Sequence, residues 1–245
     1  MQPRDWNALG QRVGGWFPPA NTFDPASAWT LTYTHEGLTP GRDGWLGGQP
    51  GGSLIVAHTP HPAGRHIKIT EQIDTVGTST TTMAEFHCAN DTLLTPRRWN
   101  LDIHWESKMP LVSVAGLDQK RAGRVENNEL VLTAAKEHRR RAPQHWTASW
   151  LLFAVLPHLP FASETRLHFD LLEEAELFKP DQQLTYIGKQ PLALGGKNLS
   201  LHVFEQVGRG VLPTRWWLDD QHRVVLAASE RHAYLLDARA KGVAS

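Results

Sequence analysis

Three polar side chains on one predicted strand have the residue types needed for acid–base catalysis. Asp102, His104 and Glu106 alternate with apolar residues, so an extended chain here places all three on one face. A carboxylate close to a histidine can orient the ring and raise its pKa, which suits a general acid or base. The row is the candidate catalytic site if it faces a cavity. If it faces water, it is only a solvated surface.

A second chemically active group lies in a proline-containing stretch. His58, His61 and His66 fall within one short segment, and Pro60 and Pro62 stiffen the chain between them. Zinc sites use three or four such ligands at about 2.1 Å, so these histidines are a candidate metal site. The stretch lacks the helical HxxxH or CxxC spacing, and the alternative is a polar turn between strands. We expect no cofactor.

Other catalytic motifs do not occur in the sequence. There is no Gly-x-Ser-x-Gly nucleophile elbow, and residues 195–198 and 208–210 are turn sequences without the frame of a phosphate-binding loop. The chain has one cysteine, Cys88, so no internal disulfide can form. We expect this thiol to be a small buried apolar group, because the adjacent His87 points to the opposite face of a strand.

Charge and length exclude several classes of protein. The 245-residue chain has 25 basic and 25 acidic residues, which argues against a nucleic-acid partner bound through phosphate neutralisation. A basic cluster over residues 136–141 is interpreted as a solvated loop, with an anion or lipid-headgroup site as the alternative. No run of 18 apolar residues occurs, so we expect no transmembrane segment. Residues 1–4 are typical of a start placed on a mature chain, which is consistent with an export signal removed before it.

Alternation of apolar and polar residues predicts a chain made mainly of strands. The clearest case is 98–106, in which Trp99, Leu101, Ile103 and Trp105 share one face. Glycine and proline over residues 37–52 predict a loop. The predicted strands are 29–35, 53–58, 65–73, 78–88, 98–106, 111–114, 123–126, 129–134, 165–171, 183–187, 198–207, 214–218, 223–228 and 233–236.

One strong helix is predicted, over residues 146–156, and Pro157 and Pro160 end it. It is apolar on all sides and must therefore be buried. Without βαβ alternation, the simplest fold is mainly β: a single strongly curved antiparallel sheet, a half-barrel, with one buried hydrophobic helix in its hollow. This domain covers residues 28–237, after an irregular N-terminal arm (1–27) and before a disordered tail (238–245).

The order of these elements resembles a known family. The matching residues are 29–33, 143–156, and 212–219 with 223–225. They resemble an uncharacterised family of bacterial cell-envelope proteins that share a half-barrel fold with the lipoprotein carriers of the periplasm. The resemblance implies a periplasmic location and a trough that shelters an acyl chain or a similar ligand. It implies no catalytic residues.

The leading hypothesis is an exported, non-catalytic half-barrel that binds a hydrophobic or amphipathic ligand, with a membrane-surface or envelope-protein partner. The ten tryptophans favour such a contact surface. One alternative is a carbohydrate-active hydrolase or lyase that uses the Asp102 row or the histidine group, and another is a structural or interaction protein without a small ligand. The candidate ligand-binding residues are Trp99, Trp105, Trp150, Phe153, Trp216 and Trp217.

Overall fold

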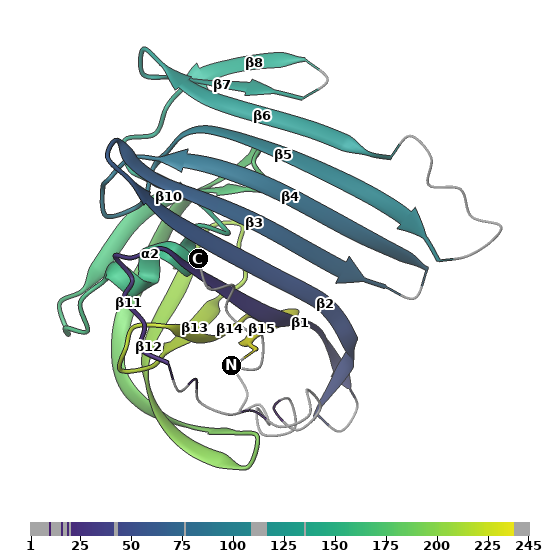
Figure 1. Ribbon diagram of the computed structural model, residues 1–245, viewed down its shortest axis with the longest axis vertical. Helices are drawn as coiled ribbons and strands as arrows, with labels where there is room; N and C mark the ends of the chain where they lie inside the picture. Colours follow the sequence, from purple (N-terminus) through teal and green to yellow (C-terminus); the bar gives the residue numbers. More distant parts are fainter. Residues whose placement is uncertain are drawn as a thin grey trace.

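The computed structural model describes residues 10, 16, 19, 21–41, 44–75, 77–108, 117–134 and 136–237. They form one sheet of 15 strands, mainly antiparallel and not closed, in the order β8-β7-β6-β5-β4-β3-β2-β1-β15-β14-β13-β12-β11-β10-β9 (Figure 1). The first and last strands of the described chain, β1 and β15, are therefore neighbours inside the sheet, and two meanders run outward from them. This architecture confirms the prediction of a mainly β fold built on one large sheet.

The elements have these bounds: β1 (Trp29–Gly41), β2 (Gly44–His61), β3 (Gly64–Asp74), β4 (Thr78–Cys88), β5 (Pro96–Ser107), β6 (Gln119–Glu126), β7 (Glu129–Thr133), β8 (Glu137–Arg141), β9 (Trp146–Ala148), α2 (Leu152–Val155), the 3₁₀ helix η1 (Leu156–His158), β10 (Arg166–Glu173), β11 (Leu177–Leu194), β12 (Lys197–Gly208), β13 (Thr214–Leu218), β14 (Val224–Ala228) and β15 (His232–Leu236).

Side-chain alternation along the strands separates a buried face from an exposed one. In β5, Trp99 and Leu101 are buried while Asn100 is exposed. In β3, Ile67 and Ile69 are buried in the same way. Because neighbouring strands are in register, these apolar rows combine into one continuous apolar surface.

The helix predicted over residues 146–156 is much shorter in the structure. Within residues 146–158 only α2 and η1 are helical, whereas residues 146–148 form β9, which pairs in parallel with β10. That pairing also departs from the prediction of an entirely antiparallel sheet. A short apolar run satisfies a buried strand as well as a buried helix, and the aromatic and β-branched residues Trp146 and Thr147 favour the strand.

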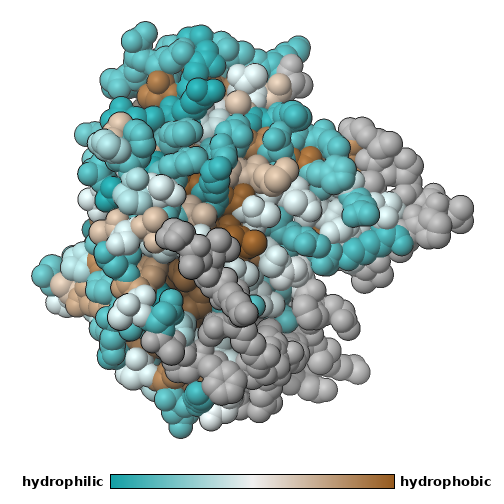
Figure 2. All heavy atoms as spheres, in the orientation of Figure 1, coloured by the Kyte–Doolittle hydropathy of each residue, from teal (hydrophilic) through white to brown (hydrophobic). Residues whose placement is uncertain are grey.

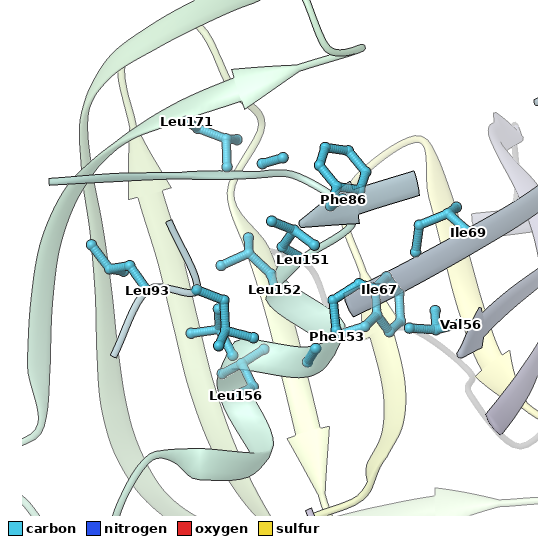
Figure 3. Close-up of a cluster of buried hydrophobic side chains, with 14 of the residues drawn as sticks. Val56, Ile67, Ile69, Phe86, Leu93, Leu151, Leu152, Phe153, Leu156 and Leu171 are labelled. Carbon is cyan, nitrogen blue, oxygen red and sulfur yellow. The ribbon is translucent and has the colours of Figure 1, made fainter. Parts of the chain in front are cut away.

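The segment around α2 belongs to the main apolar cluster. The side chains of residues 151–156 are at most 3% exposed. Figure 3 shows Leu152 and Phe153 of this segment among Val56, Ile67 and Phe86, which come from β2, β3 and β4. The cluster also contains residues of β10, β12 and β13, so this short segment shares one core with both meanders.

A second apolar cluster lies on the other face of β13, β14 and β15. It includes Trp217, Leu226 and Leu235 together with Trp16 from the N-terminal region. The Trp16 indole Nε1 donates a hydrogen bond of 2.9 Å to the carbonyl oxygen of Leu236. Every residue of β14 is buried, as expected for a strand with an apolar cluster on each face.

Two loop predictions are wrong. The segment 37–52 is predicted as a loop, but its described residues, 37–41 and 44–52, belong to β1 and β2, with register irregularities near Glu36 that accommodate the glycine-rich chain. The basic stretch forms the edge strand β8, whose five residues are all exposed. Charged side chains on an edge strand oppose pairing with another sheet. A charged, polar sequence is therefore compatible with a strand at this position.

Some predictions fall outside the described residues. These are the strand at 111–114, most of the arm at 1–27, and the tail at 238–245. In the part of the chain that the structure describes, no helix has the length and apolar character needed to cross a membrane.

His58 gives the fold a predicted sensitivity to acid. It is 1% exposed, and its Nδ1–H donates a hydrogen bond of 2.8 Å to the Ser27 carbonyl oxygen. Burial lowers the pKa of His58 from 6.5 to about 4. The unfolded chain therefore takes up a proton at a higher pH than the folded chain, and the stabilising effect, complete above the unfolded pKa, is lost as the pH falls. We expect a loss of about 2 kcal/mol between about pH 6.5 and 4.5.

Urea unfolding at several pH values measures this loss. The variant His58→Asn, which keeps a donor for Ser27 but cannot titrate, should flatten the profile, whereas His61→Asn at an exposed position should leave it unchanged. An equally steep profile for His58→Asn would show that another group carries the acid sensitivity.

Candidate ligand-binding site

The described residues line a large cavity that is partly open to solvent, on the buried face of the sheet. Its volume is about 720 Å³, and β1, β3 to β6, β10 and β12 to β15 contribute to its wall together with residues 149, 150, 152 and 153. Figure 2 shows hydrophobic residues near the centre of one face of the molecule, with mainly hydrophilic residues above them. A volume of several hundred cubic ångströms is typical of small-molecule sites.

Aromatic rings form much of the cavity wall. Trp105, Trp150, Phe153 and Trp216 all line it. The indole Nε1 atoms of Trp105 and Trp216 are buried and have no hydrogen-bond partner among the described residues. An indole N–H is a donor only, so each ring combines a large apolar surface with an unused donor.

A buried carboxylate interrupts this apolar wall. Glu71 on β3 lines the cavity and is 5% exposed. Its Oε1 accepts a hydrogen bond of 2.7 Å from the hydroxyl of Tyr234, and its Oε2 accepts one of 3.2 Å from the indole Nε1 of Trp150. Both donors are neutral groups, so the negative charge is held in place without a cation in these contacts.

Two histidines stand next to Tyr234, the partner of this carboxylate. The ring of His35 lies 4.9 Å from the ring of Tyr234, and the ring of His232 lies 5.6 Å from it. Burial, together with the charge of Glu71, raises the pKa of Tyr234 well above its usual range. The hydroxyl therefore remains a proton donor to Glu71 at neutral pH.

Charged side chains lie toward the β6 side of the cavity wall. Arg121 of β6 forms ion pairs with Glu174 at 3.7 Å and with Glu176 at 3.1 Å. Arg121 and Glu174 line the cavity, whereas Glu71 lies among aromatic groups. The cavity therefore combines a charge-balanced region with an apolar one that holds a carboxylate.

The predicted acid–base row lies on the opposite face of β5 from the cavity. Ile103 and Trp105 line the cavity, whereas His104 and Glu106 are exposed and Asp102 is partly exposed. His104 Nδ1 lies 2.9 Å from an oxygen of Asp118, and both side chains are more than half exposed. The Asp102 carboxylate lies 3.8 Å from the ammonium of Lys120. This placement favours the solvated-surface interpretation of the row.

The predicted histidine group is not brought together. His58 is buried, with its ring stacked on Trp29 at 5.2 Å. His61 is exposed at the β2–β3 turn. His66 is on the opposite face of the sheet from His58, because it alternates with the buried Ile67 that pairs with His58. There His66 lies beside His87 and Glu85 instead.

Four of the six predicted ligand-binding residues line the cavity, and two do not. Trp99 is 1% exposed and packs against Trp146, and its Nε1 donates a hydrogen bond of 3.2 Å to the Ala175 carbonyl oxygen. Trp217 is on the other face of β13, in the second apolar cluster. These two rings therefore pack in the apolar clusters that stabilise the fold and do not line the cavity.

Sequence reasoning did not single out Glu71 or Tyr234. A signal for Glu71 was present, because strand alternation puts it on the same face as Ile67 and Ile69. A carboxylate in an otherwise apolar row is unusual and indicates a partnered or functional group. Tyr234 shares its face with Leu236 in the same way, but its pairing with a strand far away in sequence could not be read from alternation.

A second set of hydrogen-bonded polar side chains, Tyr186, His202 and Asp220, lies elsewhere in the molecule. The hydroxyl of Tyr186 lies 2.8 Å from His202 Nδ1, and His202 Nε2 lies 3.0 Å from an oxygen of Asp220. The ring of Phe161 stacks on His202 with 3.6 Å between the centroids, and Lys189 pairs with Asp220 at 2.6 Å. Because Phe161 covers the imidazole, we interpret this chain as a structural link between β11, β12 and the β13–β14 turn.

Comparison with known proteins informs the fold alone. The sequence matches no protein-family model, and no curated protein is similar to it. One solved structure, a beta-barrel-like protein of the domain of unknown function DUF1849 from Brucella abortus, is similar with a TM-score of 0.53 and 8% sequence identity. The similarity covers 86% of this chain and 96% of that one. A barrel-like bacterial protein therefore shares the overall arrangement of strands.

Proposed function

We propose that this protein binds an amphipathic small molecule in the hollow of a strongly curved sheet. The observation that carries the proposal is the cavity of about 720 Å³, whose aromatic wall holds the buried carboxylate of Glu71. An apolar pocket with a few convergent polar groups is the usual form of a ligand site. The polar groups fix one end of the ligand, and the rings cover its apolar body.

The chain connectivity supports the curvature that this proposal requires. β8 and β9 are the two edges of the sheet, yet only four residues, 142–145, separate them in sequence. A flat sheet would place its edges about 65 Å apart at roughly 4.8 Å per strand. The five steps from Arg141 to Trp146 reach at most about 18 Å. This short connection supports a sheet that bends back on itself, which is the half-barrel around α2 that we propose.

The proposal assigns the cavity to binding and not to catalysis. The predicted acid–base row faces away from it, and Tyr234 and Trp150 already occupy one oxygen each of Glu71. We place the protein in the cell envelope, in agreement with the resemblance in the sequence. Fractionation of cells that express the full-length gene tests this location separately from ligand binding.

A co-purifying ligand is the direct test of the function. Native mass spectrometry of purified protein, followed by organic extraction, should identify an amphipathic species at close to one molecule per chain. Where the purified protein is empty, titration with a dansyl-labelled fatty acid or alkylamine should give saturable fluorescence enhancement. An empty protein that binds neither probe contradicts the proposal.

A bulky side chain inside the cavity should block this binding. Thr80 of β4 lines the cavity and pairs with Trp105 on the neighbouring strand. The variant Thr80→Trp fills part of the space, while the aromatic side chain remains compatible with a strand. We expect at least about a tenfold loss of probe affinity, which corresponds to about 1.4 kcal/mol.

The adjacent residue provides a matched control for this variant. Thr81 points to the opposite face, where it pairs with the exposed His104. Thr81→Trp carries the same substitution in the same strand and should retain the parent affinity. Equal affinities for both variants would place the probe outside the cavity.

A further inference from the structure

Three potential metal ligands come together on the face of the sheet opposite the cavity. His66 of β3 and His87 of β4 are direct partners across the two strands. Their rings are stacked, with 4.5 Å between centroids and 6° between planes. Glu85 precedes His87 by two residues and therefore points to the same face. One ligand atom from each residue lies within 4.8 Å of those of the other two.

The strands that carry these three side chains are fixed by the core beneath them and by their neighbouring strands. The residues that alternate with them, Ile67 and Phe86, are fully buried in the main apolar cluster. Both strands are interior strands of the sheet, each paired on both sides. Sites built on such strands are positioned more precisely than sites on loops.

One nitrogen of this group that could coordinate a metal makes no hydrogen bond in the part of the chain that the structure describes. The Nε2 atom of His66 is buried and has no hydrogen-bond partner among the described residues. A buried polar nitrogen without a partner costs free energy, and coordination of a cation would satisfy it. His66 is therefore the residue that would gain most from a bound ion.

We propose that His66, Glu85 and His87 form a binding site for a divalent transition metal of the zinc class. Two imidazole nitrogens and one carboxylate oxygen are a recognised zinc ligand set, with the fourth position open to water or another ligand. Tetrahedral coordination with bonds of about 2.1 Å separates ligand atoms by about 3.4 Å, so small side-chain rotations bring these three into place.

One neighbouring cation competes for the carboxylate. The ammonium of Lys68 lies 2.8 Å from Glu85 Oε1, and the two side chains are 58% and 39% exposed. Exposed ion pairs of this kind contribute little free energy, so a divalent ion can displace the lysine. Removal of the lysine side chain should leave metal affinity unchanged or increase it.

Metal titration of tag-free, chelator-treated protein tests the site. Calorimetry with zinc chloride should show one site per chain with micromolar affinity or better, and cobalt(II) should give the absorption of a low-coordinate complex. His87→Thr and Glu85→Gln keep strand-compatible side chains and should each lower the affinity at least about tenfold. His168→Thr, which removes an exposed histidine of β10, should have no effect.

The outcomes separate this site from binding elsewhere on the surface. Lys68→Ala should bind zinc at least as tightly as the parent protein. Circular dichroism of each variant establishes that the sheet is intact. The proposal is overturned if the parent protein shows no stoichiometric binding, or if His87→Thr and His168→Thr bind the metal equally well.

Discussion

Truncation of Phe153 to alanine is expected to lower the free energy of unfolding by about 3–5 kcal/mol. The ring is 3% exposed and contacts three other rings, those of Tyr33, Trp216 and Tyr234, at centroid distances of 4.8, 5.0 and 5.6 Å. These partners come from β1, β13 and β15, so the substitution loosens the junction of the two meanders. Because Phe153 also lines the cavity, part of the vacated space opens to solvent, and the cost should fall near the lower end.

Urea denaturation with matched variants measures this effect. Phe153→Leu retains much of the volume and should cost less than half as much as Phe153→Ala. Phe161, which is only partly buried, provides a second aromatic comparison, and Phe161→Ala should also cost less. If Phe153→Ala cost less than about 1 kcal/mol, the segment around α2 would not be embedded in the core.

The strands could be predicted where one face of the sheet is buried and the other is exposed to solvent. The predicted strand 98–106 corresponds to β5, and its apolar row is the one that faces the core and the cavity. Alternation carries this information directly, because each residue must point to one face or the other. It could not give the pairing of β1 with β15, which joins the two ends of the described chain and depends on contacts distant in sequence.

The failures have local physical causes. The stretch 146–156 is apolar without interruption, so its composition does not distinguish a strand from a helix, and the structure divides it into β9, α2 and η1. Glycine and proline suggested a loop at 37–52, but β1 and β2 tolerate them through register irregularities. At β8, pairing with β7 outweighs the polarity of five exposed residues.

The candidate site was predictable only in its apolar part. Trp105, Trp150, Phe153 and Trp216 could be selected from the sequence because large rings mark apolar contact surfaces. The neighbouring sequence does not distinguish them from Trp99 and Trp217, which pack into the main and the second apolar cluster. The polar part depends on a contact between Glu71 and Tyr234, which are 163 residues apart in sequence and come together only in the folded sheet.

Neutralisation of Glu71 is expected to change which charged ligands the cavity accepts. The carboxylate is buried among neutral partners, so dissolved salt screens its charge on a ligand only weakly. A charge about 6 Å away contributes roughly 1.4 kcal/mol at an effective dielectric constant of about 40. Glu71→Gln should weaken an alkylammonium probe by about tenfold and strengthen a fatty-acid anion of equal chain length by about tenfold. The preference between the two probes should therefore change by roughly 100-fold.

Competition titrations with dodecylamine and dodecanoate against one fluorescent probe measure this preference. Glu106→Gln is the matched control, because it removes an exposed carboxylate on the face of β5 that points away from the cavity. Glutamine can keep both contacts, because its amide oxygen can accept from the Trp150 indole N–H while its NH2 group donates to the Tyr234 hydroxyl, so the cavity wall keeps its shape and the charge is the main variable. If both probes weakened equally, Glu71 would act by shaping the wall; if neither changed, the ligand would not lie beside it. Only an opposite response of the two probes assigns the buried carboxylate to recognition of the charged end of the ligand.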